Sequence, residues 1–401
     1  MEQIVIPSSN IQINLTYEIE EFRSQWDINN NIPIMLSLDY LIGLEHSKPD
    51  GMKLVYGYIQ KKNKTIALFH LQIVGFDAEK RLRVQLETGQ SSTLSDKIAL
   101  AIKLFFARKV NIQGIILGNL LTAGPYGIVF DKELQLSEKS SLIEEFSSAL
   151  ISKSKSLEGI SMVVIKDINP EESLSASTCK KHSRFHEFTI QPSMCLRIRT
   201  NWTSIDDYLG DLESKYRMKL KKVLRLGEQL KVIDADYALL EDNEDKIFAL
   251  YHEVAEAVGF NLVDLKKEYF LSIKKSVPRN FKVKLVYLEN ELVAFYSYFD
   301  NGTIMNAHFV GYRKIFNRSL ELYHNILLFY LKDAISIGSS SIEFARTALE
   351  IKSSLGAEPI DYYCYIAHKS HFINKLVPSI LDLLKPVEEW QPRSPFKKAS
   401  S

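Results

Sequence analysis

Lys53-Leu54-Val55-Tyr56 recurs in the second half of the chain as Lys284-Leu285-Val286-Tyr287. In each copy a polar turn follows and leads into a second apolar strand, so both copies predict a β-hairpin. A later apolar segment starts at Ile115 in the first copy and at Ile342 in the second. The number of residues between the second hairpin strand and this segment is the same in both copies. Solenoid repeats have periods of about 20–50 residues, so a repeat this long indicates two copies of one mixed α/β domain.

Length and composition agree with a two-domain globular protein. The chain has 401 residues, of which 46% are hydrophobic and 25% are charged. This length fits two cores of about 200 residues each better than a single core. The formal net charge of +1 argues against a surface built throughout for nucleic acid, but it leaves room for a local basic patch.

The cysteines and the N-terminus favour a cytoplasmic protein. Cys179, Cys195 and Cys364 are widely spaced, and no pair of cysteines or of cysteine and histidine has the spacing of a zinc site. We therefore expect reduced, structural thiols and no metal. The first residues lack the basic and apolar regions of a signal peptide, and no apolar run reaches the roughly 18 residues of a membrane span. Peripheral contact with a membrane stays open.

Strands and helices alternate along the chain, which predicts an α/β or mixed α+β fold. In the first half we expect strands at 52–60, 65–75, 82–88, 115–117 and 160–165 and helices at 95–107 and 140–157. The polar segment 169–183 then places a domain junction near residue 185, giving domains 1–185 and 186–401. In the second half we expect one or two strands within 185–199, a hairpin at 281–310, strands at 342–344 and 361–367, and helices at 202–208, 215–225, 244–258 and 319–337.

The helix predicted at 215–225 is the most basic segment of the chain. Ser214 to Arg225 contains six Lys or Arg residues among twelve and no acid, whereas a merely solvated helix usually mixes both signs. Its charges would suit nucleotide phosphates, a tRNA backbone, an acidic carrier protein or anionic lipid headgroups. Only Tyr216 supplies an aromatic ring, so base stacking on a single strand is not expected.

Four segments of the second half, taken in order, resemble the tandem GNAT-like acyltransferases, the group that includes Fem-type aminoacyl transferases and the BioF-type acetyltransferase domain. They are Leu212–Gly227, Leu292–Phe295, His308–Tyr323 and Phe344–Ala357, where Lys352 follows Arg346 by six residues. The resemblance covers most of 200–370, and in the first half only Gly118–Gly124 and the unit before it look similar.

The resemblance implies two tandem GNAT-like domains, each a mixed sheet flanked by helices. It implies transfer of an acyl group from a thioester donor, acyl-coenzyme A or acyl carrier protein, to an amine acceptor such as an amino acid or amino lipid. No covalently bound cofactor and no DNA partner are expected. Two alternatives stay open: Fem-type transfer from tRNA to a cell-wall precursor, ranked lower because no long helical-hairpin arm is evident, and a non-catalytic binding or scaffold protein.

The resemblance also places the active site in the second domain, with the first domain degenerate. Arg346 lies just past a predicted strand, where ligands of open α/β sheets bind, and it could fix an anionic group together with Lys352. Asn119 stands at the repeat position of Arg346, which agrees with loss of a site in the first domain. A plain surface pair, with Glu350 as a partner, is the alternative for Arg346 and Lys352.

The strand-to-helix turn departs from simple GNAT enzymes, which use a glycine-rich turn there to hold the pyrophosphate of coenzyme A. The turn Gly311–Ser319 has one glycine and three basic residues, so side chains would replace the backbone cradle. The phosphate-binding candidates are Arg313, Lys314 and Arg318, joined by Tyr216, Arg217 and Lys221 of the basic helix.

Polar side chains on and near the strand at 304–312 are the catalytic candidates. Asn306 and His308 alternate with Tyr312 along this strand, so we expect Asn306 and His308 on one side of the sheet. His308 is the candidate general base for an amine, with a buried core histidine as the alternative. Glu253 is a second candidate base, and Tyr323 on the next helix would help to orient the amine. Neither a P-loop nor a G-x-S-x-G elbow occurs.

Overall fold

The computed structural model describes the chain except residues 8, 28–31, 78–110, 154–156, 158, 173–183, 259–262, 385–389 and 398–401. The strand expected at 82–88, the helix expected at 95–107 and Cys179 lie outside the described residues. The chain divides into two compact units. Unit 1 is Met1–Ile190 with Val258–Lys266 and Tyr362–Lys385, and unit 2 is Gln191–Ala257 with Lys267–Asp361 and Pro386–Ser401.

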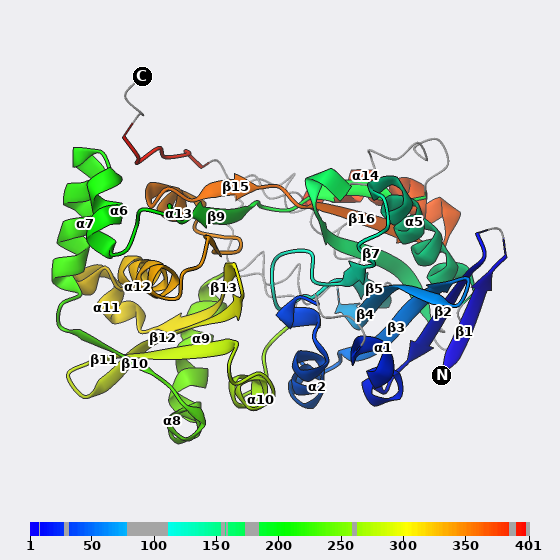
Figure 1. Cartoon of the computed structure of the whole chain (residues 1–401), viewed down its shortest axis with the longest axis horizontal. Helices are drawn as coiled ribbons and strands as arrows, with labels where there is room; N and C mark the ends of the chain where they lie inside the picture. Colours follow the sequence, from blue (N-terminus) through cyan, green and yellow to red (C-terminus); the bar gives the residue numbers. More distant parts are fainter. Residues whose placement is uncertain are drawn as a thin grey trace, which may run out of the picture. The chain divides into compact units, whose positions relative to one another are not determined.

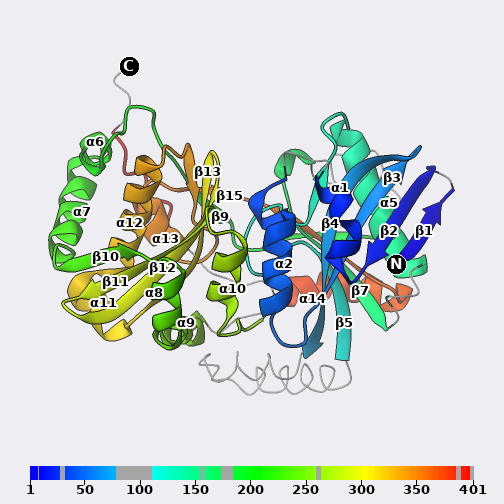
Figure 2. The ribbon, with the colours of Figure 1, turned by 60° about the horizontal axis from the view of Figure 1, so that its bottom comes forward.

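Unit 1 is built on a mixed sheet whose strands lie in the order β1-β2-β3-β4-β5-β7-β16-β8, with β6 pairing with β4. The strands are β1 (Glu2–Ile6), β2 (Ile11–Thr16), β3 (Lys53–Lys61), β4 (Lys64–Asp77), β5 (Asn111–Leu117), β6 (Ile128–Phe130), β7 (Ile160–Ile168), β8 (His186–Thr189) and β16 (Tyr363–His368). Its α-helices are α1 (Arg23–Asp27), α2 (Leu38–Ser47), α5 (Leu136–Lys153) and α14 (His371–Leu384). Figure 2 shows α2 and α5 flanking this sheet.

Local sequence explains the main hairpin and the core of unit 1. Lys62 and Asn63 join β3 to β4 with φ of 51° and 64°, the two positive values of a turn that matches the twist of paired strands. Apolar residues of the sheet and of α5 form one core, in which the rings of Phe69 and Phe146 lie 4.4 Å apart. The repeated segment 53–56 therefore lies in a hairpin, as predicted.

Unit 2 is built on a second mixed sheet in the order β10-β11-β12-β13-β14-β9-β15. The strands are β9 (Ser193–Arg197), β10 (Leu230–Asp234), β11 (Phe281–Leu288), β12 (Glu291–Asn301), β13 (Ile304–Tyr312), β14 (Ser341–Glu343) and β15 (Glu358–Ile360). The helices are α6 (Ile205–Asp211), α7 (Ser214–Leu226), α8 (Tyr237–Asp242), α9 (Glu244–Val258), α10 (Tyr269–Ser276), α11 (Lys314–Leu320), α12 (Leu322–Ser336) and α13 (Leu349–Ser354).

Helices cover both faces of the unit 2 sheet. Figure 1 shows α7, α11 and α12 on one face and α8, α9 and α10 on the other. Nine of the fifteen residues of α12 are buried, and its apolar ones belong to the core on the first of these faces. One helix was expected over 319–337, but Glu321 adopts a left-handed φ of 47° and separates α11 from α12.

Strand β16 comes from the C-terminal part of the chain yet belongs to the sheet of unit 1, where it pairs with β7 and β8. The sequence had placed this strand in the second domain. β9, which follows β8 in the chain, belongs to the sheet of unit 2 and pairs with β14 and β15. Across the described residues no helix is long and apolar enough to cross a membrane.

The order of strands in the two sheets shows that the segments after the hairpins were paired wrongly in the sequence repeat. In unit 1, β4 pairs antiparallel with β5, and β5 pairs parallel with β7. In unit 2, β12 pairs antiparallel with β13, and β13 pairs parallel with β14. β7 is therefore the counterpart of β14, so matching Ile115 to Ile342 was wrong, and Asn119 is not the counterpart of Arg346. Short apolar strands look alike in sequence, which made the equal spacing misleading.

Candidate functional site

Two parallel strands of unit 2 separate and leave an opening between them. β13 pairs with β14 only from Ile304 to Asn306, opposite Ser341 to Glu343. β13 then continues to Tyr312, and no strand in the described part of the chain pairs with this edge beyond Asn306. The two strands therefore form an opening, called the V below, which closes at Asn306 and Glu343.

The backbone of β13 presents hydrogen-bond donors to the V. The Arg313 N–H donates to a carbonyl of β12 at 2.9 Å, and the Phe309 N–H donates to the Ser297 hydroxyl of β12 at 3.1 Å. Successive N–H groups of a strand point to opposite edges, so the N–H groups of Val310 and Tyr312 point away from β12 and into the V. Such donors can stabilise negative charge on a carbonyl oxygen.

A buried carboxylate lies at the base of the V. Glu343 is 6% exposed, and its Oε2 accepts a hydrogen bond from Asn306 Nδ2 at 2.9 Å. Its Oε1 accepts a hydrogen bond from the Ser193 hydroxyl at 3.1 Å. Buried carboxylates are costly and concentrate at functional sites, so Glu343 is a candidate base. Glu343 was not among the residues predicted from the sequence, where its one signal is an acid inside the apolar segment Ile342–Phe344.

Lys352 holds the loop that follows β14. Its Nζ donates hydrogen bonds to the carbonyls of Phe344, Ala345 and Arg346 at 2.8, 3.2 and 2.6 Å. Burial lowers the pKa of Lys352 to about 7, while the three carbonyl oxygens favour the charged ammonium. All three ammonium protons are used within the protein, so we treat Lys352 as a positioning residue and not as a direct ligand for an anion.

The loop that Lys352 holds has a strained backbone. Ala345, Thr347 and Ala348 have φ of 56°, 68° and 49°, in the left-handed region that residues other than glycine rarely adopt. Strain of this kind persists only where the surroundings hold it in place, and it gathers at functional sites. Arg346 lies in the same loop and donates a hydrogen bond from Nε to the Gln191 carbonyl at 2.9 Å. The structure therefore brings Arg346, Lys352 and Glu343 together at the end of β14.

His308 does not have the properties of a general base. Its Nε2 lies 2.8 Å from the Tyr269 hydroxyl, and the rings of Phe281 and Phe299 surround it. Burial lowers the pKa of His308 to about 3, so the ring is neutral but only weakly basic near pH 7. The alternative of a core histidine, held by one hydrogen bond, fits these contacts.

The low pKa of His308 predicts acid sensitivity. The unfolded state binds a proton as the pH falls below about 6.5, while folded His308 binds one only near pH 3. The stability linked to this group is therefore complete above about pH 6.5 and is lost as the pH falls towards 3. From pH 7 to pH 5 the loss from His308 should be about 2 kcal/mol.

Urea unfolding at pH 7 and pH 5 measures this loss. His308→Phe should reduce the pH-dependent change by about 2 kcal/mol relative to the unmodified protein. His371→Phe, at an exposed position of α14, serves as the control. Equal pH dependence in the protein and in His308→Phe would show that His308 titrates normally.

A β-bulge places Tyr312 on the opposite face from Asn306 and His308. The register between β12 and β13 shifts between Tyr296 and Tyr298, which inserts an extra residue into β13. Beyond the bulge Tyr312 packs in the core with α12, where its ring lies 5.9 Å from that of Tyr323. Tyr312 and Tyr323 are thus brought together, but away from Asn306.

The turn after β13 holds a carboxylate where a phosphate was expected. Glu253 of α9 accepts a hydrogen bond from the Lys314 N–H at the start of α11, at 2.6 Å. Arg313 lies 3.4 Å from Glu253 and 3.2 Å from Glu291. Glu253 therefore occupies this anion position, and neither Glu253 nor Arg313 lies near the base of the V.

The remaining candidates lie on helices. Arg318 is exposed on α11, and Lys221 is exposed on α7. Arg217 donates hydrogen bonds to the Leu212 carbonyl and the Ser214 hydroxyl, so its guanidinium is held at the start of α7. Tyr216 packs partly buried against the core of unit 2. These residues do not contribute to the V.

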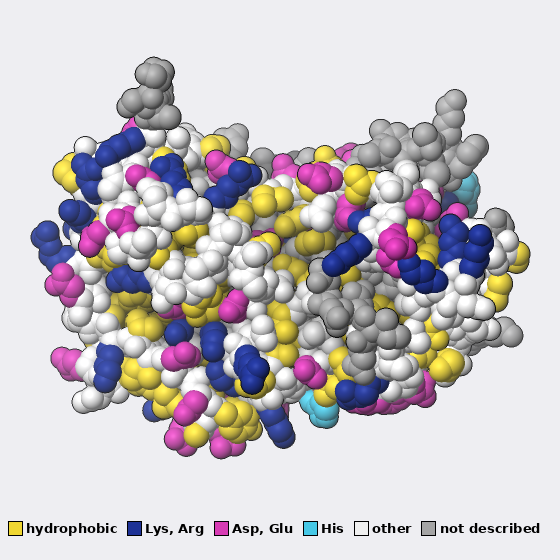
Figure 3. Space-filling view, in the orientation of Figure 1, with side chains coloured by type: hydrophobic (Ala, Val, Ile, Leu, Met, Phe, Trp, Pro, Cys, Tyr) yellow, Lys and Arg dark blue, Asp and Glu magenta, His cyan; other side chains and the backbone are white. Residues whose placement is uncertain are grey.

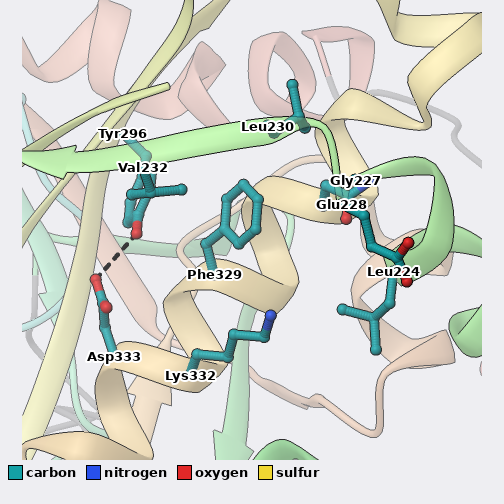
Figure 4. Close-up of a pocket in the computed structure, with 10 residues that line it drawn as sticks. Leu224, Gly227, Glu228, Leu230, Val232, Tyr296, Phe329, Lys332 and Asp333 are labelled. Carbon is teal, nitrogen blue, oxygen red and sulfur yellow. Dashed lines mark hydrogen bonds between the residues drawn. The ribbon is translucent and has the colours of Figure 1, made fainter. Parts of the chain in front are cut away.

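A separate hollow of about 500 Å³ lies between α7, β10 and α12. Figure 4 shows Asp333 and Tyr296 joined by a hydrogen bond in its lining, where the Tyr296 hydroxyl donates to Asp333 at 3.0 Å. Burial raises the pKa of Asp333, and Lys284 lies 3.9 Å away. These polar groups satisfy one another, and no residue at the base of the V lines this hollow, so we place the candidate site at the V.

The corresponding place in unit 1 lacks an opening. β5 pairs with β7 up to its last residue, Leu117. The following loop is fixed by buried side chains: Lys166 donates to the Thr122 carbonyl at 2.8 Å, and Asp167 accepts from the Gly124 N–H at 3.0 Å. Unit 1 therefore fills with its own side chains the position that is open in unit 2.

Solved structures share this fold. FemX matches 96% of this chain and 100% of its own with a TM-score of 0.53 and 12% identity. A tandem GNAT protein from the clavulanic acid biosynthesis pathway (10% identity, 89% of this chain, 99% of its own) and L-PGS from Bacillus licheniformis (12% identity, 88% and 98%) both match with a TM-score of 0.48. No family model and no curated protein sequence matches the chain. The chain has the tandem GNAT-like fold of Fem-type proteins, as the sequence predicted.

Proposed function

We propose that this protein is an N-acyltransferase that moves an acyl group from a thioester to an amine within the V of unit 2. The observation that carries the proposal is the V itself, with open backbone donors along β13 and a buried carboxylate at its base. Together they offer a place for a carbonyl carbon, an oxyanion site and a proton acceptor. Unit 1, where β5 is fully paired, is not assigned an activity.

In the proposed reaction the amine nitrogen attacks the thioester carbonyl carbon and forms a C–N bond. The N–H groups of Val310 and Tyr312 stabilise the oxyanion. The amine proton passes to Glu343, directly or through water, and the C–S bond then breaks with its electron pair on sulfur. The thiolate receives the proton and leaves as a thiol, so that Glu343 returns to its starting state.

Arg346 and Lys352 have different roles in this proposal. Lys352 fixes the carbonyls of residues 344–346 and so sets the shape of one wall of the V. Arg346 brings a guanidinium to the same loop, where it would favour an acceptor that carries a carboxylate or phosphate. An amino acid or an amino lipid has such a group beside its amine.

A second candidate is Fem-type aminoacyl transfer, in which the donor is an ester on tRNA. The hydrogen bond from the Lys314 N–H to Glu253 supports this candidate. The Glu253 carboxylate fills the position where the pyrophosphate of coenzyme A would bind, whereas an aminoacyl-tRNA donor needs no pyrophosphate there. A donor that binds without placing a pyrophosphate at the Lys314 N–H could serve either acyl transfer from a thioester or aminoacyl transfer from tRNA.

A thermal-shift panel tests the proposal. Acyl-pantetheine, short and long acyl-coenzyme A, tRNA and UDP-sugars would each be added to the purified protein, because a ligand of the folded state raises the midpoint. We expect a shift with acyl thioesters, and release of free thiol when amino acids or amino lipids are added. A shift with tRNA or UDP-sugar alone would favour aminoacyl transfer, and no shift with any ligand would favour a non-catalytic binding or scaffold protein.

A further inference from the structure

One face of α7 carries only positive charge. Its exposed side chains include the basic residues Lys215, Lys219, Lys221, Lys222 and Arg225. None of them forms an ion pair with the residues that the structure describes, and α7 contains no acid. Figure 3 shows several dark blue side chains at the upper left, where Figure 1 places α7, with acidic side chains of other segments among them. The opposite face of α7 is anchored by buried Leu220 and Val223, so the basic face is held towards solvent.

This basic face also exposes apolar surface. Met218 lies among the cations and is 67% exposed. Ile315 is 73% exposed on α11, which packs against α7. The chain as a whole has a net charge of only +1, so the charge on α7 is local and not part of a generally basic surface. Cations that surround an exposed apolar side chain are suited to a partner with acidic and apolar groups on one surface.

The neighbouring turn does not offer a competing anion site. Glu253 already occupies the Lys314 N–H at the start of α11, and it pairs with Arg313. The anionic part of a thioester donor would therefore have to be held elsewhere on unit 2. The basic face of α7, on the helix that packs beside α11, supplies charges that no described acid neutralises.

We propose that the basic face of α7 docks a small acidic carrier protein that delivers the thioester to unit 2, an inference that rests on the proposed acyl transfer. Met218 would pack against an apolar side chain of the carrier while the surrounding cations pair with its carboxylates. A nucleic acid is the less suitable partner, because its backbone offers no apolar surface to Met218. The one ring of this helix, Tyr216, is partly buried and so is poorly placed for stacking on bases.

Binding of a purified apo acyl carrier protein tests the docking surface. The variant Lys215→Glu/Lys221→Glu/Lys222→Glu reverses three charges on α7. The matched control is Lys231→Glu/Lys246→Glu/Lys275→Glu, three exposed lysines on β10, α9 and α10. We expect the unmodified protein and the control to bind with the same Kd, and the α7 variant to bind at least tenfold more weakly.

A second variant and a salt series keep the test decisive. Met218→Glu should also weaken carrier binding at least tenfold, and binding by the unmodified protein should weaken as salt rises. Equal losses in the α7 variant and in the control, or binding of tRNA but not of the carrier, would overturn the proposal.

The apo carrier has no acyl group, so carrier docking is measured independently of acyl transfer. Transfer from acyl-pantetheine without carrier binding would refute docking alone, and carrier binding without transfer would refute the proposed function alone.

Discussion

Glu343→Gln should lower kcat/KM for acyl transfer by about 10²–10⁴-fold, the range expected when a positioned general base is removed. The amide is close in size to the carboxylate, and its oxygen can still accept the hydrogen bond from Asn306. The fold should therefore persist while the proton acceptor is lost. Steady-state rates of thiol release, with an unchanged thermal midpoint, measure this effect.

Glu358→Gln is the matched control for this prediction. Glu358 is exposed on β15, two strands away from Glu343 in the same sheet. It should leave kcat/KM within about twofold of the unmodified protein, because a surface substitution away from the site rarely matters. If Glu343→Gln retained full activity, another group or solvent would have to take the amine proton, and our assignment of the base would be wrong.

Lys352→Met should destabilise the protein by about 3 kcal/mol and abolish activity. The substitution keeps a flexible chain of similar length but leaves the carbonyls of Phe344, Ala345 and Arg346 without their shared donor. A buried acceptor left unsatisfied costs about 1–3 kcal/mol, and the strained loop would relax to recover part of that loss. Urea unfolding gives the change in the free energy of unfolding.

Lys369→Met, at an exposed position just before α14, controls for the loss of one positive charge. It should change the free energy of unfolding by less than about 0.5 kcal/mol. A similarly small change in Lys352→Met would contradict the idea that Lys352 holds the loop. It would instead return Lys352 to the role first expected from the sequence, an ammonium that binds an anion directly.

Local patterns predicted much of the fold. The hairpins at 53–77 and 281–301, the basic helix α7 and the helix α9 follow from polar turns, charge and apolar periodicity. The placement of β8 and β16 in the sheet of unit 1 did not, because strand pairing joins residues far apart in the chain. The matching of Ile115 to Ile342 failed for the same reason, since only the sheet order identifies which strands correspond.

The sequence predicted where the loop of Arg346 and Lys352 lies in the fold, but not the partners of its side chains. The loop with Arg346 and Lys352 does lie at the end of β14, where the chemistry of open sheets suggested. The partners of these side chains are set by packing: Lys352 bonds to three carbonyls, and Glu253 reaches the Lys314 N–H from another helix. The face of Tyr312 depended on a bulge, which alternation along a strand does not foresee.

Hydrogen exchange at the β13 amides tests the central claim most directly. The probe is an acyl-pantetheine analogue in which a methylene separates sulfur from the carbonyl, so that it binds but cannot transfer its acyl group. If the V binds the thioester, exchange at the Val310 and Tyr312 N–H groups should slow when the analogue is added, with no change at Ile115–Leu117 of unit 1. Protection confined to the hollow beside Asp333, or to unit 1, would contradict the assignment of the V as the active site.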